Sequence, residues 1–160
     1  MKDAPLLSET FGCPIVVHRE EMEYIHSPEV KLSPYSARIF EAFENGVKAN
    51  GMLVEDEQHL SLGSLDIRVM KVPGHSQASI CFYVEAETAI FDGDTLFWRS
   101  IGRTDFYHGS SMDLLTSIRQ RLLTLPSDVK VYPGHGPATT VGQETVQNPF
   151  LNSPMGMWDL

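Results

Sequence analysis

The sequence predicts a mixed fold of the α/β or α+β class, with a sheet that helices cover on at least one face. Several short stretches alternate apolar and polar residues, which is typical of half-buried strands. One later stretch instead repeats apolar residues with the spacing of a helical face. The length of 160 residues is that of one domain, or of a piece of a slightly larger one.

The first half of the chain contains one clear strand and one clear hairpin. A β-branched run at 13–18 predicts a buried strand, and 19–25 reads as one or two helical turns. The segment 26–50 is broken by prolines and glycines, so we expect a looser region with a short helix at 36–43. Alternating residues at 59–62 and 65–69, separated by Gly63-Ser64, predict a hairpin.

The second half continues the sheet and adds one amphipathic helix. A second strand pair is expected at 79–84 and 88–91, joined across 85–87, and a further strand is expected at 129–132. Apolar residues at helical spacing predict a helix over 112–123, with Ser110 or Ser111 as its N-cap. The segment 139–160 is expected to run over the surface. We predict a domain at 1–150 and a C-terminal tail at 151–160.

Composition excludes several classes of partner. Lys and Arg number 12 against 21 Asp and Glu, which gives a net charge of −9. Neither nucleic acid nor an anionic membrane is expected to bind such a chain without a basic cluster. The sequence has no apolar run of membrane-spanning length, and its first residues do not resemble a secretory signal. We therefore expect a cytoplasmic protein, with Cys13 and Cys81 as buried free thiols.

Three predicted strand ends carry metal-binding side chains. Two nearly identical segments run from an apolar strand into Pro-Gly-His and present His75 and His135. A third apolar run breaks at Gly93 and presents Asp94. A single loop histidine is usually solvated, but the repeated pattern favours a site for zinc, with iron or manganese as alternatives.

The motifs around these residues resemble the metallo-β-lactamase superfamily, and most closely its glyoxalase II-like (hydroxyacylglutathione hydrolase-like) members. The matching segments are PGHS at 73–76, FDGDTLF at 91–97, IGRTD at 101–105 and YPGHGPATT at 132–140, and the resemblance ends with NPFL at 148–151. It implies an αββα sandwich and a site for two metal ions, usually zinc. It also implies a small-molecule substrate, a thioester of the S-acyl glutathione type, which metal-bound hydroxide hydrolyses.

The resemblance assigns roles to the three residues. It makes His75 a ligand of the first ion and His135 a ligand of the second, and it makes Asp94 the catalytic carboxylate that bridges both. The family's leading H-x-H-x-D-H motif has no counterpart in this sequence. We therefore expect an N-terminally truncated member, an incomplete sandwich that lacks its first strands.

Truncation would leave each ion with two ligands, where a catalytic zinc normally has three. Occupancy should then be weak or partial, unless one ion is held jointly by His75, Asp94 and His135. The family's glutathione-binding C-terminal extension is not evident after Phe150. No organic cofactor site is predicted.

Other residues near these motifs have two interpretations each. Asp92 is a spare ligand or, preferably, a turn residue. Arg103 and Asp105 are expected to form a buried or loop-fixing pair rather than to contact substrate. His108 is expected to be solvated. Four aromatic residues are expected to pack rather than to form a substrate cage, namely Phe97, Trp98, Phe106 and Tyr107.

Three functions fit the sequence. The first is a metal-dependent hydrolase whose activity is impaired in this chain alone. The second is a non-catalytic remnant or a partner subunit without a complete metal site. The third is iron chemistry of the persulfide dioxygenase type, which iron content with oxygen consumption would reveal.

An open sheet edge should make the purified chain associate with itself. We expect light scattering to report a homodimer, or a hydrophobic dye to bind with increased fluorescence. A monodisperse monomer that does not increase the fluorescence of the dye would contradict this expectation.

Overall fold

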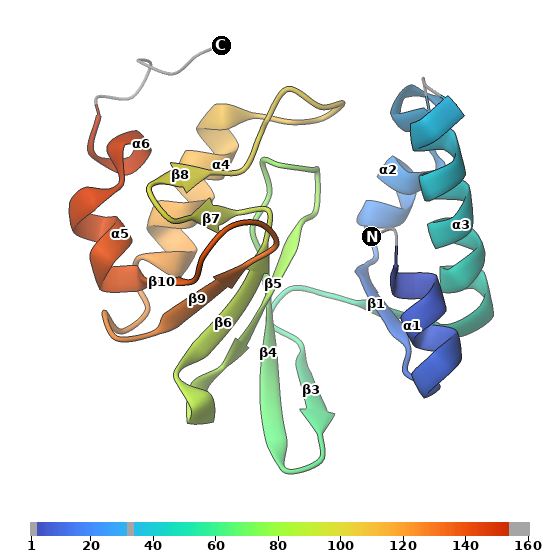
Figure 1. Cartoon of the computed structure of the whole chain (residues 1–160), viewed down its shortest axis with the longest axis horizontal. Coiled ribbons are helices and arrows are strands. Elements are labelled where there is room, and N and C mark those ends of the chain that lie inside the picture. Colours follow the sequence, from blue (N-terminus) through green and yellow to red (C-terminus); the bar gives the residue numbers. More distant parts are fainter. Residues whose placement is uncertain (1–2, 32–33, 154–160) are drawn as a thin grey trace. The chain divides into compact units, whose positions relative to one another are not determined.

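The computed structural model describes residues 3–31 and 34–153 and confirms the mixed α/β class. The chain divides into two compact units, Met1–Glu55 and Asp56–Leu160 (Figure 1). Each unit has a hydrophobic core of its own.

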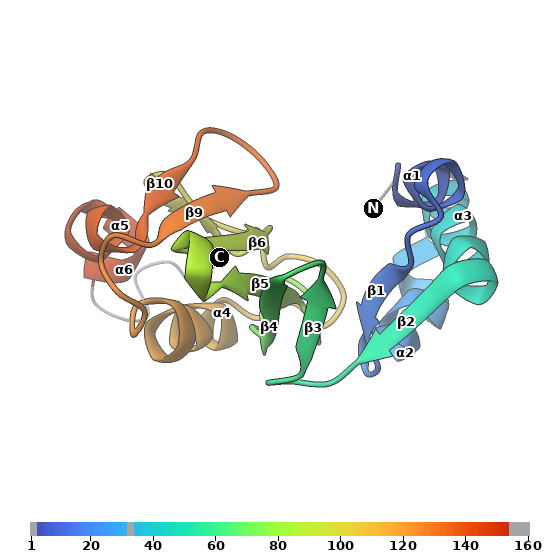
Figure 2. The ribbon, with the colours of Figure 1, turned by 90° about the horizontal axis from the view of Figure 1, so that it is seen from below.

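The first unit is built on two parallel strands, β1 (Ile15–His18) and β2 (Gly51–Val54), which lie side by side in Figure 2. Helices α1 (Ala4–Phe11), α2 (Glu21–His26) and α3 (Pro34–Asn50) complete it, with a 3-10 turn, η1, at Pro28–Lys31. Parallel strands need a long crossover connection, which the helical segments between β1 and β2 supply. The buried core consists of Ile15, Val17, Tyr24, Ile25, Val30, Phe43 and Val47.

The loose region predicted at 26–50 is wrong, because α3 alone runs over 17 residues. Phe43 and Val47, four residues apart on one helical face, are both buried in the core. Gly46 looked like a break in the sequence but lies inside the helix. A Cβ atom at this position would lie 2.9 Å from Cδ1 of Ile15, so the glycine allows α3 to pack closely against β1.

The second unit contains a six-stranded sheet with the order β10-β9-β6-β5-β4-β3. Its neighbouring strands are antiparallel except for β6 and β9, which are parallel. The structure confirms both predicted strand pairs and the strand near 129–132. The bounds are His59–Leu62 for β3, Leu65–Lys71 for β4, Ile80–Val84 for β5, Ala89–Gly93 for β6, Lys130–Pro133 for β9 and Thr139–Thr140 for β10.

A small separate hairpin follows β6. Its strands are β7 (Leu96–Phe97) and β8 (Ser100–Ile101), with Trp98 and Arg99 at the turn. A 3-10 turn, η2 (Glu85–Glu87), joins β5 to β6.

Helices pack against the six-stranded sheet to form the core of the second unit. Helix α4 (Ser111–Ser117) continues into a π-helical turn, η3 (Ile118–Leu122), which confirms the predicted amphipathic helix. Ser110 is the N-cap, and its Oγ accepts a hydrogen bond of 3.2 Å from the backbone N–H of Asp113. The buried core residues are Met70, Val72, Cys81, Tyr83, Ile90, Leu96, Leu114, Leu115, Ile118, Leu122, Val129, Val131, Val141 and Leu151.

The surface tail predicted from residue 139 is wrong over the part that the structure describes. Helices α5 (Val141–Gln147) and α6 (Pro149–Asn152) follow β10, and Val141 and Leu151 belong to the core. The predicted boundary at 150/151 therefore falls inside α6. Residues 154–160 of the predicted tail lie outside the described residues.

The cysteine prediction is half right. Cys81 is a buried free thiol in the core, whereas Cys13 is a free thiol that is exposed. Burial raises the pKa of the Cys81 thiol far above its ordinary value, so this thiol stays protonated. Cys13 follows the end of α1, where the chain turns toward β1.

One face of the sheet presents aromatic rings to solvent. Phe91 on β6 and Tyr132 on β9 are opposite each other in the parallel register, and their rings stack with centroids 5.3 Å apart. They are 50% and 39% exposed. Ile90 and Val131, their neighbours on the same strands, point to the other face and are fully buried, as the alternation of a strand requires.

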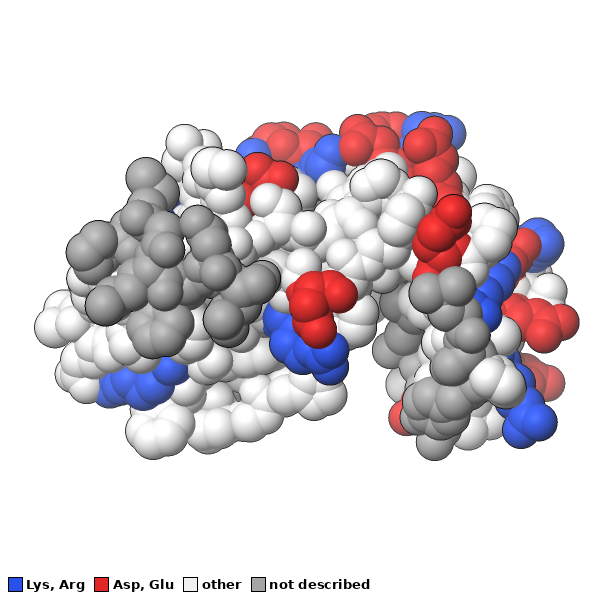
Figure 3. Space-filling model, turned by 90° about the horizontal axis from the view of Figure 1, so that it is seen from above, with Lys and Arg blue, Asp and Glu red and all other residues white. Residues whose placement is uncertain are grey.

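The helices and the surface charge of the structure bear on the expectation that neither a membrane nor nucleic acid is a partner. Within residues 3–31 and 34–153, no helix is both long enough and apolar enough to cross a bilayer. On the face drawn in Figure 3, Lys and Arg side chains are interspersed with Asp and Glu.

A charge cluster holds the helices of the first unit together. Glu44 on α3 accepts hydrogen bonds from Lys48 at 2.7 Å and from Lys31 at 3.0 Å, and His26 lies 3.2 Å away. The Glu44 side chain is only 15% exposed. Hydrogen bonds from Lys48 and Lys31 lower the pKa of Glu44 to about 2.

This low pKa predicts a pH-dependent stability of the first unit. The stabilisation is complete above the ordinary glutamate pKa of about 4.5 and is lost as the pH falls toward 2, because the native carboxylate must then be protonated. Glu44→Gln should reduce the free energy of unfolding at pH 7 by about 1–2 kcal/mol and flatten its pH dependence. Hydrogen exchange of the α3 amides measures both effects.

The matched control is Glu41→Gln, which removes an exposed carboxylate from the same helix. It should change the exchange rates little. Equal effects of the two substitutions would show that helix charge in general, rather than the Glu44 cluster, sets the stability.

Candidate metal centre

Strand direction brings the three predicted site residues to one edge of the sheet. β4 and β6 are both antiparallel to β5, so they run in the same direction, and β9 runs parallel to β6. The carboxyl ends of all three strands therefore lie at the same edge. His75 follows β4, Asp94 follows β6 and His135 follows β9.

The three side chains meet at Asp94. Nε2 of His75 lies 3.6 Å from Oδ2 of Asp94, and Nε2 of His135 lies 3.5 Å from Oδ1. Each imidazole thus faces a different oxygen of one carboxylate. The predicted convergence of these residues is confirmed.

The His75 ring is fixed by the loop that follows β8. Nδ1 of His75 lies 2.8 Å from the backbone carbonyl oxygen of Arg103. Because a carbonyl only accepts, Nδ1 carries a proton and donates the hydrogen bond, and Nε2 is the ring nitrogen that faces Asp94. The Phe106 ring packs edge-on against the same imidazole, with centroids 5.2 Å apart.

His135 is held less closely. Its side chain is 78% exposed, compared with 24% for His75. The ring of Phe97 on β7 meets it edge-on, with centroids 6.3 Å apart. The second imidazole is therefore the more accessible of the two.

Both Pro-Gly-His turns require their glycine. Gly74 has φ +133°, a backbone conformation that favours glycine, and a Cβ atom there would also lie 2.4 Å from the backbone of Leu114. Gly134 does not have a positive φ. It is needed for close approach, because a Cβ atom there would lie 2.6 Å from Oδ1 of Asp94. The N–H of Gly134 also donates to the carbonyl of Gly93 at 2.7 Å, which joins the His135 turn to the Asp94 turn.

Asp92 has the structural role that the sequence favoured. It is buried, and its Oδ2 accepts a hydrogen bond of 2.8 Å from the backbone N–H of Leu96 across the turn. Burial, with the nearby Asp94 charge, raises the pKa of Asp92 to about 8. Among the described residues, its Oδ1 has no hydrogen-bond partner.

The predicted pair of Arg103 and Asp105 exists and fixes the loop, but it is exposed rather than buried. Two hydrogen bonds of 2.9 and 2.8 Å join the guanidinium to the carboxylate. This pairing lowers the pKa of Asp105. The guanidinium also lies over the Phe106 ring, 4.6 Å from its centroid.

The four aromatic residues expected to pack rather than to form a substrate cage differ in their exposure. Trp98, Phe106 and Tyr107 are all exposed, because they stand on the loops around the site rather than on the core face of the sheet. Phe97 is half-buried. His108 is exposed, as predicted, and its ring contacts that of Tyr107.

The donor set fits a divalent metal ion. Two ligands of a tetrahedral zinc, each about 2.0–2.1 Å from the ion, lie about 3.3–3.4 Å from each other. The spacings of 3.5 and 3.6 Å are close to that value and longer than a direct N–H···O hydrogen bond of about 2.9 Å. In the described part of the chain, however, no three His, Cys, Asp or Glu side chains form a group that could hold a metal. Each oxygen of Asp94 therefore forms a pair of metal-binding atoms with one imidazole nitrogen, so that two donors are available at each position.

Two parts of the site could not be found from the sequence. The carbonyl of Arg103 orients His75, but a backbone atom has no signature in a list of side chains. Glu144 and Asn148 are buried beside the β7–β8 hairpin, yet they occur in a polar helical segment that resembles an exposed one.

Comparison with known proteins agrees with the fold and the motifs. The family model described as the metallo-beta-lactamase superfamily matches residues 2–135. The protein ML0493 of Mycobacterium leprae is 42% identical over 94% of this chain and 70% of its own length. The probable metallo-hydrolase YqgX of Bacillus subtilis is 35% identical over 90% of this chain and 66% of its length.

A third relative has a more specific name but a shorter match. The hydroxyacylglutathione hydrolase GloC of Haemophilus influenzae is 41% identical over 99 residues, which are 62% of this chain and 47% of that protein.

Two solved structures share most of this chain. BLEG-1, a B3 metallo-beta-lactamase, is 33% identical with a TM-score of 0.78 and covers 95% of this chain and 71% of its own. TTHA1623 in a di-iron-bound form is 28% identical with a TM-score of 0.71, and the match covers 94% of this chain and 71% of that chain.

The close approach at Gly134 can be tested by adding one methyl group. Gly134→Ala should displace the Asp94 carboxylate, because the new Cβ would lie 2.6 Å from its Oδ1. We expect the ring nitrogen resonances of both His75 and His135 to shift. The exposed His59, which pairs with Asp66 on the β3–β4 hairpin, is the internal reference and its resonances should not shift. An unchanged His75 signal in Gly134→Ala would contradict the contact.

Proposed function

The chain belongs to the metallo-beta-lactamase superfamily, and on this premise we propose that it is a zinc-dependent hydrolase of thioesters of the S-acyl glutathione type. The observation that carries the proposal is the placement of two imidazoles on separate oxygens of Asp94. The name of YqgX supports metal-dependent hydrolysis, and the name of GloC supports the thioester class.

The proposed ligands divide between two positions. His75 and Oδ2 of Asp94 would hold one ion, and His135 and Oδ1 would hold the other, with Asp94 bridging them. A divalent ion bound there supplies Lewis acidity, which lowers the pKa of water and polarises a substrate carbonyl.

The chain's own residues prepare this site for a cation and a substrate. The Arg103 carbonyl keeps the proton on Nδ1 of His75, so Nε2 remains a donor to metal. The Phe106 and Phe97 rings flank the two imidazoles and limit the directions from which solvent reaches them. Because the His135 side chain is exposed, a substrate can reach it from solvent.

Zinc is the proposed metal because imidazole nitrogen and carboxylate oxygen are among its usual ligands. Iron and manganese accept the same donors, and the related TTHA1623 is described in a di-iron-bound form. Metal content of the purified chain separates the three.

A second candidate function has one observation in its favour. Among the described residues, no three His, Cys, Asp or Glu side chains form a group that could hold one metal ion. A non-catalytic remnant, or a subunit completed by another chain, would show this arrangement as well. Absence of bound metal together with an unchanged His135→Ala variant would support it.

The proposal predicts a graded loss of zinc on substitution. Asp94→Ala should remove binding at both positions and weaken zinc affinity by more than about 100-fold, since it contributes to each ligand pair. His135→Ala should remove one position and leave that of His75. Competition against a chromophoric chelator measures affinity, and elemental analysis measures stoichiometry.

The control is His59→Ala, which removes an exposed imidazole paired with Asp66 on the β3–β4 hairpin. It should leave zinc binding unchanged. Thioesterase turnover that follows zinc content through this series would support the hydrolase. Equal zinc binding by the parent and Asp94→Ala would overturn the proposed site.

A further inference from the structure

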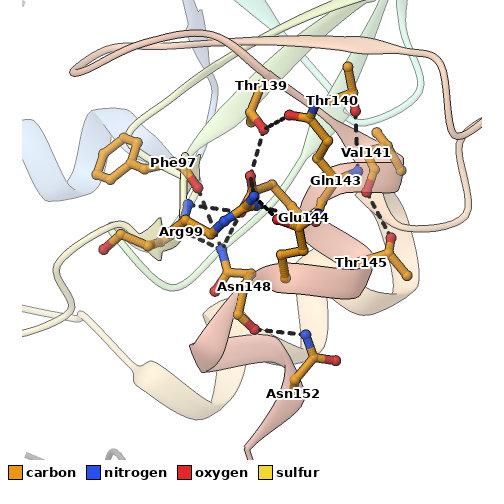
Figure 4. A network of polar contacts seen from close by, with 12 residues as sticks. Phe97, Arg99, Thr139, Thr140, Val141, Gln143, Glu144, Thr145, Asn148 and Asn152 are labelled. Atoms are coloured by element: carbon orange, nitrogen blue, oxygen red, sulfur yellow. Dashed lines mark hydrogen bonds and ion pairs between the residues drawn. The ribbon is translucent and has the colours of Figure 1, made fainter.

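Glu144 on α5 is a buried carboxylate with an unusually complete set of partners. It is 0% exposed. Its oxygens accept hydrogen bonds from the Arg99 backbone N–H at 2.9 Å, the Arg99 guanidinium at 3.1 Å, the Thr139 hydroxyl at 2.5 Å and the Asn148 amide at 2.9 Å. Figure 4 shows these groups converging on the carboxylate from three segments of the chain.

Two of the partner residues of Glu144, Arg99 and Thr139, come from the segments that carry Asp94 and His135. Arg99 is in the β7–β8 hairpin, five residues after Asp94. Thr139 begins β10, four residues after His135. One carboxylate therefore ties the chain that leaves Asp94 to the chain that leaves His135.

The turn of the hairpin depends on this contact. Arg99 has φ +58°, a left-handed conformation that costs energy for a residue with a side chain. Its backbone N–H and its guanidinium both bind Glu144, and the guanidinium also contacts Gln147. These bonds stabilise the strained turn.

Asn148 holds the strands of the same hairpin. It is fully buried, and its amide donates to the carbonyl of Ser100 at 2.9 Å and lies 3.5 Å from that of Phe97. Its Oδ1 accepts from the N–H of Phe150, which caps α6. Glu144 and Asn148 thus fix the hairpin at its turn and on both strands.

The hairpin in turn reaches all three residues of the candidate centre. At its end, Gly102 packs so closely on Asp94 that a Cβ atom there would lie 1.9 Å from the Asp94 carbonyl oxygen. The backbone carbonyl oxygen of the next residue, Arg103, accepts a hydrogen bond from Nδ1 of His75. On the other strand, Phe97 meets the ring of His135.

We propose that Glu144, assisted by Asn148, is a positioning residue that sets the spacing of His75, Asp94 and His135. It touches none of the three and acts through the β7–β8 hairpin and β10. Its relevance to metal binding rests on the proposed function. Its effect on the geometry of the three side chains does not.

The test compares Glu144→Gln with Leu122→Ala, a fully buried core substitution in the same unit. Circular dichroism sets a temperature at which both variants remain folded. Glu144→Gln should lower zinc affinity at least about tenfold, as expected when a group that orients ligands is lost. Leu122→Ala should leave the affinity within about twofold of the parent.

A second readout needs no metal. The ring nitrogen resonances of His75 and His135 should shift in Glu144→Gln and remain in place in Leu122→Ala, with the exposed His59 as internal reference. Thr139→Val keeps the carboxylate and its Arg99 pair, so it should shift His135 and leave His75 unchanged. It also provides the test if Glu144→Gln does not fold.

The outcomes separate the two proposals. A parent chain that binds no zinc, with histidine shifts as expected, contradicts the proposed function and supports the positioning role. Zinc binding with unchanged histidine signals in Glu144→Gln and Thr139→Val overturns the positioning role. Equal losses of affinity in Glu144→Gln and Leu122→Ala overturn it as well, because global destabilisation then explains both.

Discussion

The common direction of β4, β6 and β9 is the constraint on which the candidate centre depends. Strands that run the same way end at the same edge of a sheet, so three short turns suffice to bring two imidazoles to one carboxylate. One face of these strands packs against α4, α5 and α6 in a continuous apolar core. That packing makes the strands a rigid support for side chains that follow them.

Close backbone packing converts this shared edge into defined distances. Gly134 and Gly102 approach Asp94 from two sides, where any side chain would collide with it. A backbone carbonyl orients His75. A buried carboxylate with four hydrogen-bond donors lies behind these contacts, and a charge removed from water is tolerated only when it is paired so fully.

The chemistry of the site follows from the two faces of Asp94. Each of its oxygens lies about 3.5 Å from Nε2 of one imidazole. This distance suits two ligands of one cation better than a direct hydrogen bond. In the proposed site, two donors for each ion would make a weaker site than the three that catalytic zinc normally has. ML0493 is longer than this chain, which covers 70% of it. Membership of the metallo-beta-lactamase superfamily and the donor atoms of the site therefore both favour metal binding. The number of protein ligands for each ion distinguishes a catalytic site, which normally has three, from a partial site.

The sequence by itself predicted β1, β3, β4, β5, β6, β9, the amphipathic helix and the convergence of His75, Asp94 and His135, because periodicity and strand-end motifs are local signals. It did not predict the short strands β2, β7, β8 and β10. It failed at α3, where Gly46 has a packing role, and at α5, where polar residues looked exposed. Only the tertiary structure placed each imidazole on its own oxygen of Asp94 and buried Glu144 behind the hairpin. Such contacts join residues as far apart as Arg99 and Glu144, whose pairing depends on the folded chain and leaves no local pattern.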